Sequence, residues 1–223
     1  MPSQPPINAY QPVPAPSYGV APELAAARAR EFADLVASRR TIREFSAQPL
    51  PAGVLEAAVR AAGSAPSGAN IQPWRFVVVT DSSRKRALRK GAEAEEREFY
   101  DRPGAQDWHA ALASLGTDWR KPFLEEAPAI IAVFEVHKGP HSPRPYYVKE
   151  SVGIAVGLLL AALHHAGLAT LTHTPSPMRF LNEILDRPAE ERPFVLIPVG
   201  YPAAAATVPA ITRKALNEVL VWS

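Results

Sequence analysis

Three arginines and a threonine form the first candidate binding site in the sequence. The segment Arg39–Arg43 reads Arg-Arg-Thr-Ile-Arg and follows directly on a predicted helix. Guanidinium groups with a hydroxyl beside them suit a phosphate monoester, because they bind it through several charge-assisted hydrogen bonds. A solvated basic helix end, which complements the helix dipole, explains the same residues. Taken alone, the segment favours the second interpretation.

A loop of small residues is the second candidate. Residues 65–70 read Ala-Pro-Ser-Gly-Ala-Asn and combine small side chains, a proline with fixed φ and exposed backbone N–H groups. A flat ligand could approach such a backbone closely. An ordinary turn is an equally good interpretation of these residues.

Composition excludes several classes of protein. The chain has 223 residues and no cysteine, which excludes disulfides, thiolate metal sites and thiol redox chemistry, so any electrons must travel on a bound cofactor. Its net charge of +2 is too balanced for a dedicated nucleic-acid binder. With 47% apolar residues, disorder over the whole length is excluded.

Common catalytic motifs are also missing. No Gly-x-Gly-x-x-Gly follows a strand and no Gly-Lys-Ser/Thr occurs, which disfavours Rossmann dehydrogenases and P-loop enzymes. The spacing of His137 and His141 is metal-like, but Gly139 and Pro140 interrupt it, so a loop without zinc is the better interpretation. Ser67 lacks the Gly-x-Ser-x-Gly frame of a nucleophile elbow.

Apolar periodicity predicts the elements that must position these groups. Interior strands are expected at residues 74–79, 129–136, 168–174 and 194–199. Helices are expected at residues 22–39, 51–62 and 82–100, and in the apolar stretch that begins near Tyr146. This order, with a short helix before the last strand, predicts a layered fold with helices on a central sheet.

The two ends of the chain differ from this pattern. Seven of the 24 prolines fall within the first 22 residues, so residues 1–21 are expected to form a flexible tail. Val219–Trp222 resembles a short apolar strand without a neighbour in sequence, and we expect it to reach a second subunit. The N-terminus shows no targeting signal and Val152–Leu163 is too short to cross a bilayer, so a cytoplasmic protein without membrane contact is expected.

Taken together, several motifs resemble the FMN-dependent nitroreductase superfamily over about residues 25–220. The segments that carry this resemblance are Arg39–Arg43, Ala65–Trp74 and Pro198–Pro202. Within that superfamily the chain is most similar to the iodotyrosine deiodinases, on the evidence of Glu150–Ala166, Thr172–Pro175 and Ala206–Pro209.

The resemblance implies an architecture and an assembly. It implies an α+β fold of the nitroreductase type over residues 22–223, with a central mixed sheet flanked by helices and a C-terminal extension reaching the partner subunit. A homodimer would bind two FMN molecules at its interface, with residues from both chains around each.

By the same resemblance, particular residues would hold FMN. Its phosphate would lie on Arg39, Arg40 and Thr41, joined by Arg213, with Arg43 close to the flavin. Ser67 and Gly68 would border the isoalloxazine ring, and Thr172 and His173 would line it. Thr174 would offer its hydroxyl to the flavin N5 atom, which favours electron transfer in single steps over hydride transfer.

Four further residues would hold the substrate, a halogenated tyrosine. The Ala69 N–H would donate to the phenolate, while Glu96, Tyr100 and Lys121 would form a lid over the amino-acid end. A zwitterion needs an anion for its ammonium and a cation for its carboxylate, and Glu96 and Tyr100 share one helix face at i,i+4. The family pattern is not matched everywhere, because Thr41 replaces the usual serine and Ala215 replaces a frequent proline.

The predicted reaction is FMN-dependent reductive removal of halide from a halotyrosine, with Thr174 and Ala69 as the catalytic positions. Electrons would come from NAD(P)H or a separate reductase. Two alternatives stay open: a nitroreductase or quinone reductase of broad specificity that uses NAD(P)H, and a noncatalytic flavin-bound sensor of aromatic amino acids.

Overall fold

The computed structural model describes residues 12–17, 19–101, 112–138 and 145–223. They fall into two units, residues 1–37 and residues 38–223. The first unit contains most of helix α1 (Pro22–Ser38), which has no buried residue. The second unit contains the sheet, the other helices and all of the candidate site residues. Most of the predicted tail, residues 1–21, lies outside the described residues, as do His109 and His141.

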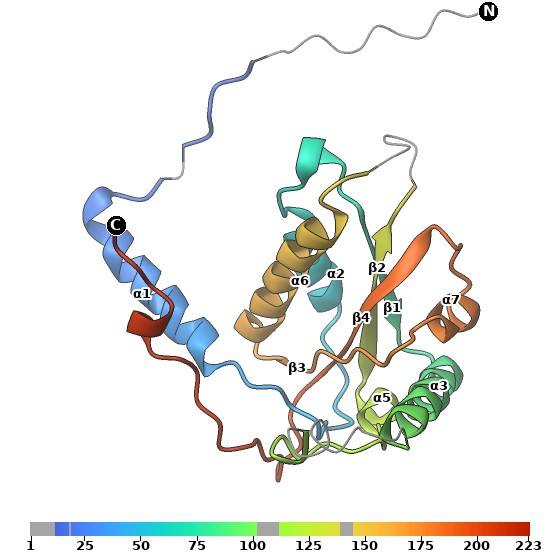
Figure 1. The fold of residues 1–223 in the computed structure, drawn as a ribbon. Helices are drawn as coiled ribbons and strands as arrows, with labels where there is room; N and C mark the ends of the chain where they lie inside the picture. Colours follow the sequence, from blue (N-terminus) through green and yellow to red (C-terminus); the bar gives the residue numbers. More distant parts are fainter. Residues whose placement is uncertain (1–11, 18, 102–111, 139–144) are drawn as a thin grey trace, which may run out of the picture. The chain divides into compact units, whose positions relative to one another are not determined.

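A four-stranded sheet in the order β1-β2-β4-β3 forms the centre of the second unit (Figure 1). Its strands are β1 (Trp74–Val79), β2 (Ala129–Val136), β3 (Ala169–Thr170) and β4 (Glu191–Gly200). All three ladders between these strands are antiparallel. Parallel pairing enters the sheet only through an isolated bridge between Thr41 and Thr170 within the described chain.

The two faces of the sheet pack against different helices. Ile130, Ala132 and Phe134 point to the face covered by α3 (Ser82–Tyr100), α5 (Phe123–Glu126) and α7 (Phe180–Ile184). Ile131 and Val133 point to the face covered by α2 (Val54–Gly63) and α6 (Val148–His165). Because side chains alternate along a strand, a continuous apolar run such as β2 is what a sheet buried on both faces requires.

Helix α6 meets the length and hydropathy of a membrane-crossing helix. Seven of its residues, including Val152, Leu159 and Leu163, are buried in the structure. Each fully buried leucine contributes about 1.5–3 kcal/mol to the free energy of unfolding. Burial of this face is typical of the core helix predicted from the sequence.

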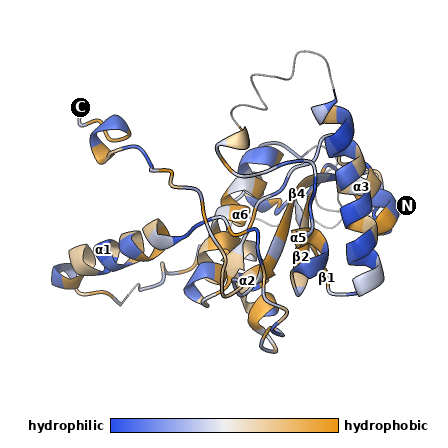
Figure 2. Ribbon diagram, turned by 90° about the horizontal axis from the view of Figure 1, so that it is seen from below, coloured by the Kyte–Doolittle hydropathy of each residue, from blue (hydrophilic) through white to orange (hydrophobic). Residues whose placement is uncertain are grey.

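Helix α3 begins where Asp81 accepts a hydrogen bond from the Arg84 main-chain N–H, at 2.8 Å. This cap satisfies one of the unpaired donors of the first turn. Only Lys85, Leu88 and Ala92 of α3 are buried, and hydrophilic residues cover most of its length (Figure 2).

The predicted α+β fold of nitroreductase type is confirmed by this architecture and by the comparisons below. The expected mixed sheet is wrong, because all three ladders are antiparallel. Two predicted strands differ from the structure. Only Ala169–Thr170 of the expected strand 168–174 joins the sheet, followed by a single bridge between His173 and Leu196. Val219–Trp222 is not a strand within this chain, where a short 3₁₀ helix, η2 (Leu216–Glu218), precedes it. Its reach to a second subunit stays a prediction.

Candidate active site

A cavity of about 290 Å³ lies between α3, the segment 117–123 and the segment 171–176. It is lined by seven residues that the sequence analysis singled out: Arg43, Glu96, Tyr100, Lys121, Thr172, His173 and Thr174. Residues 82–100 and 117–121 lie apart in the sequence, and the fold places them side by side. The cavity therefore joins the predicted lid to the predicted flavin wall.

Lys121 is the most deeply buried charge in this cavity, at 3% exposure. Its Nζ lies 3.3 Å from Oε2 of Glu96 and also donates to the carbonyl of Asp118. Burial lowers the pKa of Lys121, and the negative charge of Glu96 opposes that shift. The predicted anion and cation of the lid are therefore paired with each other in the structure.

Tyr100 belongs to the same lid. Its hydroxyl donates to the carbonyl of Thr117, at 3.4 Å. Burial raises the pKa of Tyr100, and the charges of Glu96 and Asp118 raise it further. The phenol therefore stays protonated and can donate a hydrogen bond at neutral pH.

His173 forms a neutral part of the opposite wall. It is 8% exposed, and its ring packs edge-on against Phe123 with centroids 5.5 Å apart. Burial lowers the pKa of His173 to about 3, and the positive charges of Lys121 and Arg43 add to the shift. Among the described residues, buried polar atoms without a hydrogen-bond partner are Nε2 of His173 and Oγ1 of Thr170. Such atoms are rare in folded proteins and often mark a place where a ligand or water binds.

Thr172 and Thr174 alternate with His173 along an extended segment. Because successive side chains point to opposite sides, His173 faces the core while both threonines are exposed. Thr172, Thr174 and Ser176 also line a second cavity of about 670 Å³. The segment 172–176 therefore lies between two cavities, and its hydroxyl-bearing residues line both of them.

The predicted phosphate-binding residues gather at the end of this segment. The Ile42 main-chain N–H donates to the carbonyl of Thr170, at 3.2 Å, which aligns residues 39–43 with β3. Arg213 donates to the Arg39 carbonyl at 2.7 Å, and Arg40 donates to the carbonyl of Pro209. Burial lowers the pKa of Arg39, and the positive charges of Arg213 and Arg40 lower it further. An anionic ligand bound here would reduce the electrostatic repulsion among these three positive charges.

The loop Ser67–Ala69 lies at the opposite end of β2 from the lid. It directly precedes β1, whose Trp74 pairs with Glu135, near the end of β2. Segment 117–121, which carries Lys121 of the lid, leads instead through α5 into Ala129 at the start of β2. Six residues of strand separate these positions, about 20 Å. Within one chain the fold therefore does not bring Ser67, Gly68 or Ala69 to the lid.

The backbone of this loop is strained. Ala69, Asn70 and Gln72 all have positive φ, at 47°, 54° and 52°. The Ser67 hydroxyl accepts from the Gln72 main-chain N–H at 2.9 Å, and a Cβ at Gly68 would lie 2.9 Å from Cε2 of Tyr146. Three left-handed residues without glycine within four positions are uncommon and concentrate at functional sites. This geometry favours the ligand-binding interpretation of the loop over the ordinary turn.

Sequence reasoning missed Glu93 and Thr170. Glu93 accepts a hydrogen bond from the Lys121 main-chain N–H at 2.9 Å, yet the charges of α3 read as a solvated helix face. Its position three residues before Glu96 and seven before Tyr100 was the available signal, because all three fall on one face of a helix. Nothing in the sequence pointed to Thr170, because only the folded structure shows that its hydroxyl is buried without a hydrogen-bond partner.

The chain belongs to the nitroreductase family, whose model matches residues 36–201. Its relatives identify a branch of that family. The iodotyrosine deiodinase of Haliscomenobacter hydrossis is 50% identical over 204 residues, which cover 90% of this chain and 92% of that protein. Iodotyrosine deiodinase 1 of Rattus norvegicus is 43% identical over 201 residues, covering 87% and 70% of the two chains.

Solved structures agree with these relatives. The crystal structure of an oxidised iodotyrosine deiodinase bound to FMN and 3-iodo-L-tyrosine matches with a TM-score of 0.74 at 35% identity, covering 86% of this chain and 98% of that one. A nitroreductase-like protein of Streptococcus mutans, at 19% identity and a TM-score of 0.65, shares the fold alone. The resemblance drawn from the sequence is confirmed.

Proposed function

We propose that this chain is an FMN-dependent enzyme that removes halide reductively from a halogenated tyrosine. The observation that carries the proposal is the Glu96–Lys121 pair, 3.3 Å apart in the wall of a cavity that also contains Thr172, His173 and Thr174. The relatives that share this fold at 35–50% identity are named for deiodination of iodotyrosine.

The residues present fit FMN. A phosphate monoester is satisfied by the gathered guanidinium groups of Arg39, Arg40 and Arg213, and the orphaned atoms of Thr170 and His173 offer unused polar contacts. FMN, when bound and reduced, supplies the two electrons with which a C–halogen bond becomes a C–H bond and halide, with uptake of one proton. Thr174 would hold a hydrogen bond to a ring nitrogen through its exposed hydroxyl.

The lid fits the head group of an amino acid. Lys121 would bind the carboxylate, Glu96 the ammonium, and Tyr100 would donate from its protonated hydroxyl. A cavity of about 290 Å³ is at the small end of ligand sites, which suits a single amino acid better than an extended molecule. Closing this lid would exclude water from the reacting carbon.

The distance of the loop Ser67–Ala69 from the lid supports a homodimer in which each chain supplies the loop of its partner's site. Exposed apolar residues are available for such an interface. Ile154 and Leu158 lie exposed on α6, and in the C-terminal extension Val221 and Trp222 are 86% and 88% exposed. Covering apolar groups of this size is what drives stable association. Electron supply from NAD(P)H or a separate reductase and a cytoplasmic location stay predictions.

Anaerobic halide release tests the function. The FMN-loaded protein is mixed with dithionite and 3-iodotyrosine, and iodide is measured against time. Stoichiometric iodide and tyrosine are expected, with much slower release by Lys121→Ala. Fast NADPH oxidation with nitroaromatics and no iodide would instead indicate a broad reductase. Tight binding of iodotyrosine without turnover would indicate a sensor.

A further inference from the structure

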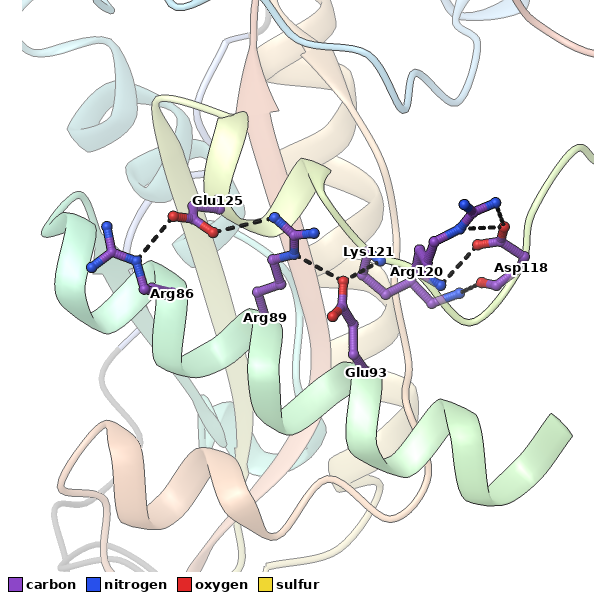
Figure 3. Close-up of polar contacts among 7 residues, drawn as sticks. All are labelled: Arg86, Arg89, Glu93, Asp118, Arg120, Lys121 and Glu125. Atoms are coloured by element: carbon purple, nitrogen blue, oxygen red, sulfur yellow. Dashed lines mark hydrogen bonds and ion pairs between the residues drawn. The ribbon is translucent and has the colours of Figure 1, made fainter. Parts of the chain in front are cut away.

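A stripe of polar residues runs along one face of α3 toward the lid. Arg86, Arg89, Glu93, Glu96 and Tyr100 follow one another at spacings of three and four, which places them on the same side of the helix. We call these five residues the α3 stripe. Figure 3 shows its first three side chains rising together toward Glu125 and Lys121.

Each member of the stripe contacts the chain between Thr117 and Glu125. Arg86 and Arg89 bind Glu125, at 3.1 and 3.3 Å. Glu96 binds the Lys121 ammonium, and Tyr100 binds the Thr117 carbonyl. The α3 stripe therefore attaches the chain from Thr117 to Glu125 to α3.

Glu93 is the central contact of the stripe. Its Oε1 accepts from the Lys121 main-chain N–H at 2.9 Å and from Nε of Arg89 at 2.8 Å (Figure 3). Its side chain is only 14% exposed. Burial raises the pKa of Glu93, but the hydrogen bonds from Arg89 and Lys121 outweigh it and hold the pKa below its usual value. The carboxylate is thus charged and fixed between the helix and the lid.

Two glutamates three residues apart hold different parts of one lysine. Glu96 contacts the ammonium of Lys121, and a substrate zwitterion would compete for that contact because it binds the same two groups. Glu93 contacts the main chain of Lys121, which a substrate head group cannot replace. The Glu93 contact therefore persists when the Glu96–Lys121 pair is exchanged for substrate.

We propose that Glu93 is a positioning residue for the substrate head group: by holding the Lys121 main chain against α3, it keeps the lysine ammonium in the cavity wall while the zwitterion replaces the internal ion pair. This inference rests on the proposed function. Without Glu93, part of the binding free energy would be spent on ordering the segment 117–121.

Two variants and one control test the proposal with the full-length, FMN-loaded protein. Glu93→Ala removes the acceptor, Glu93→Gln retains an amide oxygen for the Lys121 N–H, and Glu126→Gln removes an exposed carboxylate of α5 as the matched control. The dissociation constant of 3-iodotyrosine is measured by quenching of flavin fluorescence, well below the melting temperature of each variant.

A rise of about tenfold in the dissociation constant is expected for Glu93→Ala, a smaller rise for Glu93→Gln, and none for Glu126→Gln. A purely structural Glu93 would lower the melting temperature of Glu93→Ala and leave the dissociation constant at the wild-type value, which overturns the proposal. A dissociation constant for Glu93→Gln equal to or above that of Glu93→Ala also overturns it. If the wild-type protein itself fails to bind 3-iodotyrosine, the proposed function fails first.

Discussion

The lid around Lys121 and the loop Ser67–Ala69 are built in opposite ways. The lid is assembled within one chain, where Glu93, Glu96 and Tyr100 hold it by contacts that are largely buried. The loop is part-exposed, and its strained backbone faces no group of the lid, because the sheet separates the two by about 20 Å. Under the proposed function, the end of the site that binds the head group is formed by one chain, whereas the end that binds the phenolate requires the second chain of the proposed homodimer.

The two regions are held in their conformations by different interactions. Ion pairs and hydrogen bonds fix Lys121, whereas the loop keeps left-handed residues that cost about 1–2 kcal/mol each. Strain of this kind persists when surrounding contacts impose it, here the Ser67–Gln72 hydrogen bond and the Tyr146 ring over Gly68.

Complementation between subunits tests most directly whether the lid and the loop of one site come from different chains. Lys121→Ala damages the lid, and Ala69→Pro removes the loop N–H and cannot adopt a φ of 47°. If each site combines the lid of one chain with the loop of the other, a purified heterodimer of the two variants has one intact site. It should release iodide at about half the wild-type rate at low substrate, although both parents are nearly inactive. Inactive heterodimers would show that both parts serve the same chain's site.

Acid should destabilise the lid end through His173. The folded chain keeps this residue neutral down to a pKa of about 3, while the unfolded chain binds a proton near pH 6.5. The corresponding stability is present above pH 6.5 and is lost as the pH falls toward 3. Urea unfolding at pH 7.5 and 4.5 should show that wild type loses about 3 kcal/mol more than His173→Gln.

His165→Gln is the control for that experiment, because His165 is exposed at the end of α6. It should follow the wild-type pH dependence. Equal acid sensitivity of wild type and His173→Gln would mean that His173 is not held neutral in the folded chain.

Removing either charge of the lid should weaken substrate binding and leave the cofactor in place. Lys121→Ala or Glu96→Gln should lower the affinity for halotyrosine by about 1–3 kcal/mol, because each loses a charge-assisted contact. Flavin-fluorescence titration measures the affinity, and flavin absorbance after gel filtration measures FMN retention. Unchanged affinity in both variants would show that the lid residues Lys121 and Glu96 do not bind the substrate.

The smallest effect is expected from relaxing the loop. Ala69→Gly removes a left-handed alanine, so the free energy of unfolding should stay level or rise by up to about 1 kcal/mol. The same substitution at Ala94, exposed in the right-handed helix α3, should lower it by about 1 kcal/mol. Thermal unfolding compares the two. A loss at Ala69 equal to that at Ala94 would mean that the loop is unstrained.

Much of the fold follows from local patterns. The strand at residues 129–136 and the helix at 82–100 were predicted at their observed bounds, because one is a continuous apolar run and the other carries charged residues at i,i+4 spacing. Val219–Trp222 forms no strand within a single chain, since apolar residues alone do not supply a pairing partner, and its contact with a second subunit stays a prediction.

The site was predictable in its members and less so in its arrangement. The structure brings Glu96, Tyr100 and Lys121 to one cavity with Thr172–Thr174, and their roles stay predictions. The separation of the loop Ser67–Ala69 from the lid depends on the antiparallel pairing of β1 with β2, which no local pattern encodes. The contact of Glu93 with Lys121 joins a helix to a segment beyond it in the chain and likewise required the fold.

Gly91 gives α3 a second role. A Cβ at this position would lie 2.5 Å from Cδ2 of Phe180, so glycine lets the first residue of α7 press directly on the α3 backbone. Phe180 closely follows the segment Thr172–Ser176, which forms the other wall of the cavity. A larger side chain at position 91 would therefore have to displace Phe180, which would move α7 away from the helix that carries Glu93, Glu96 and Tyr100.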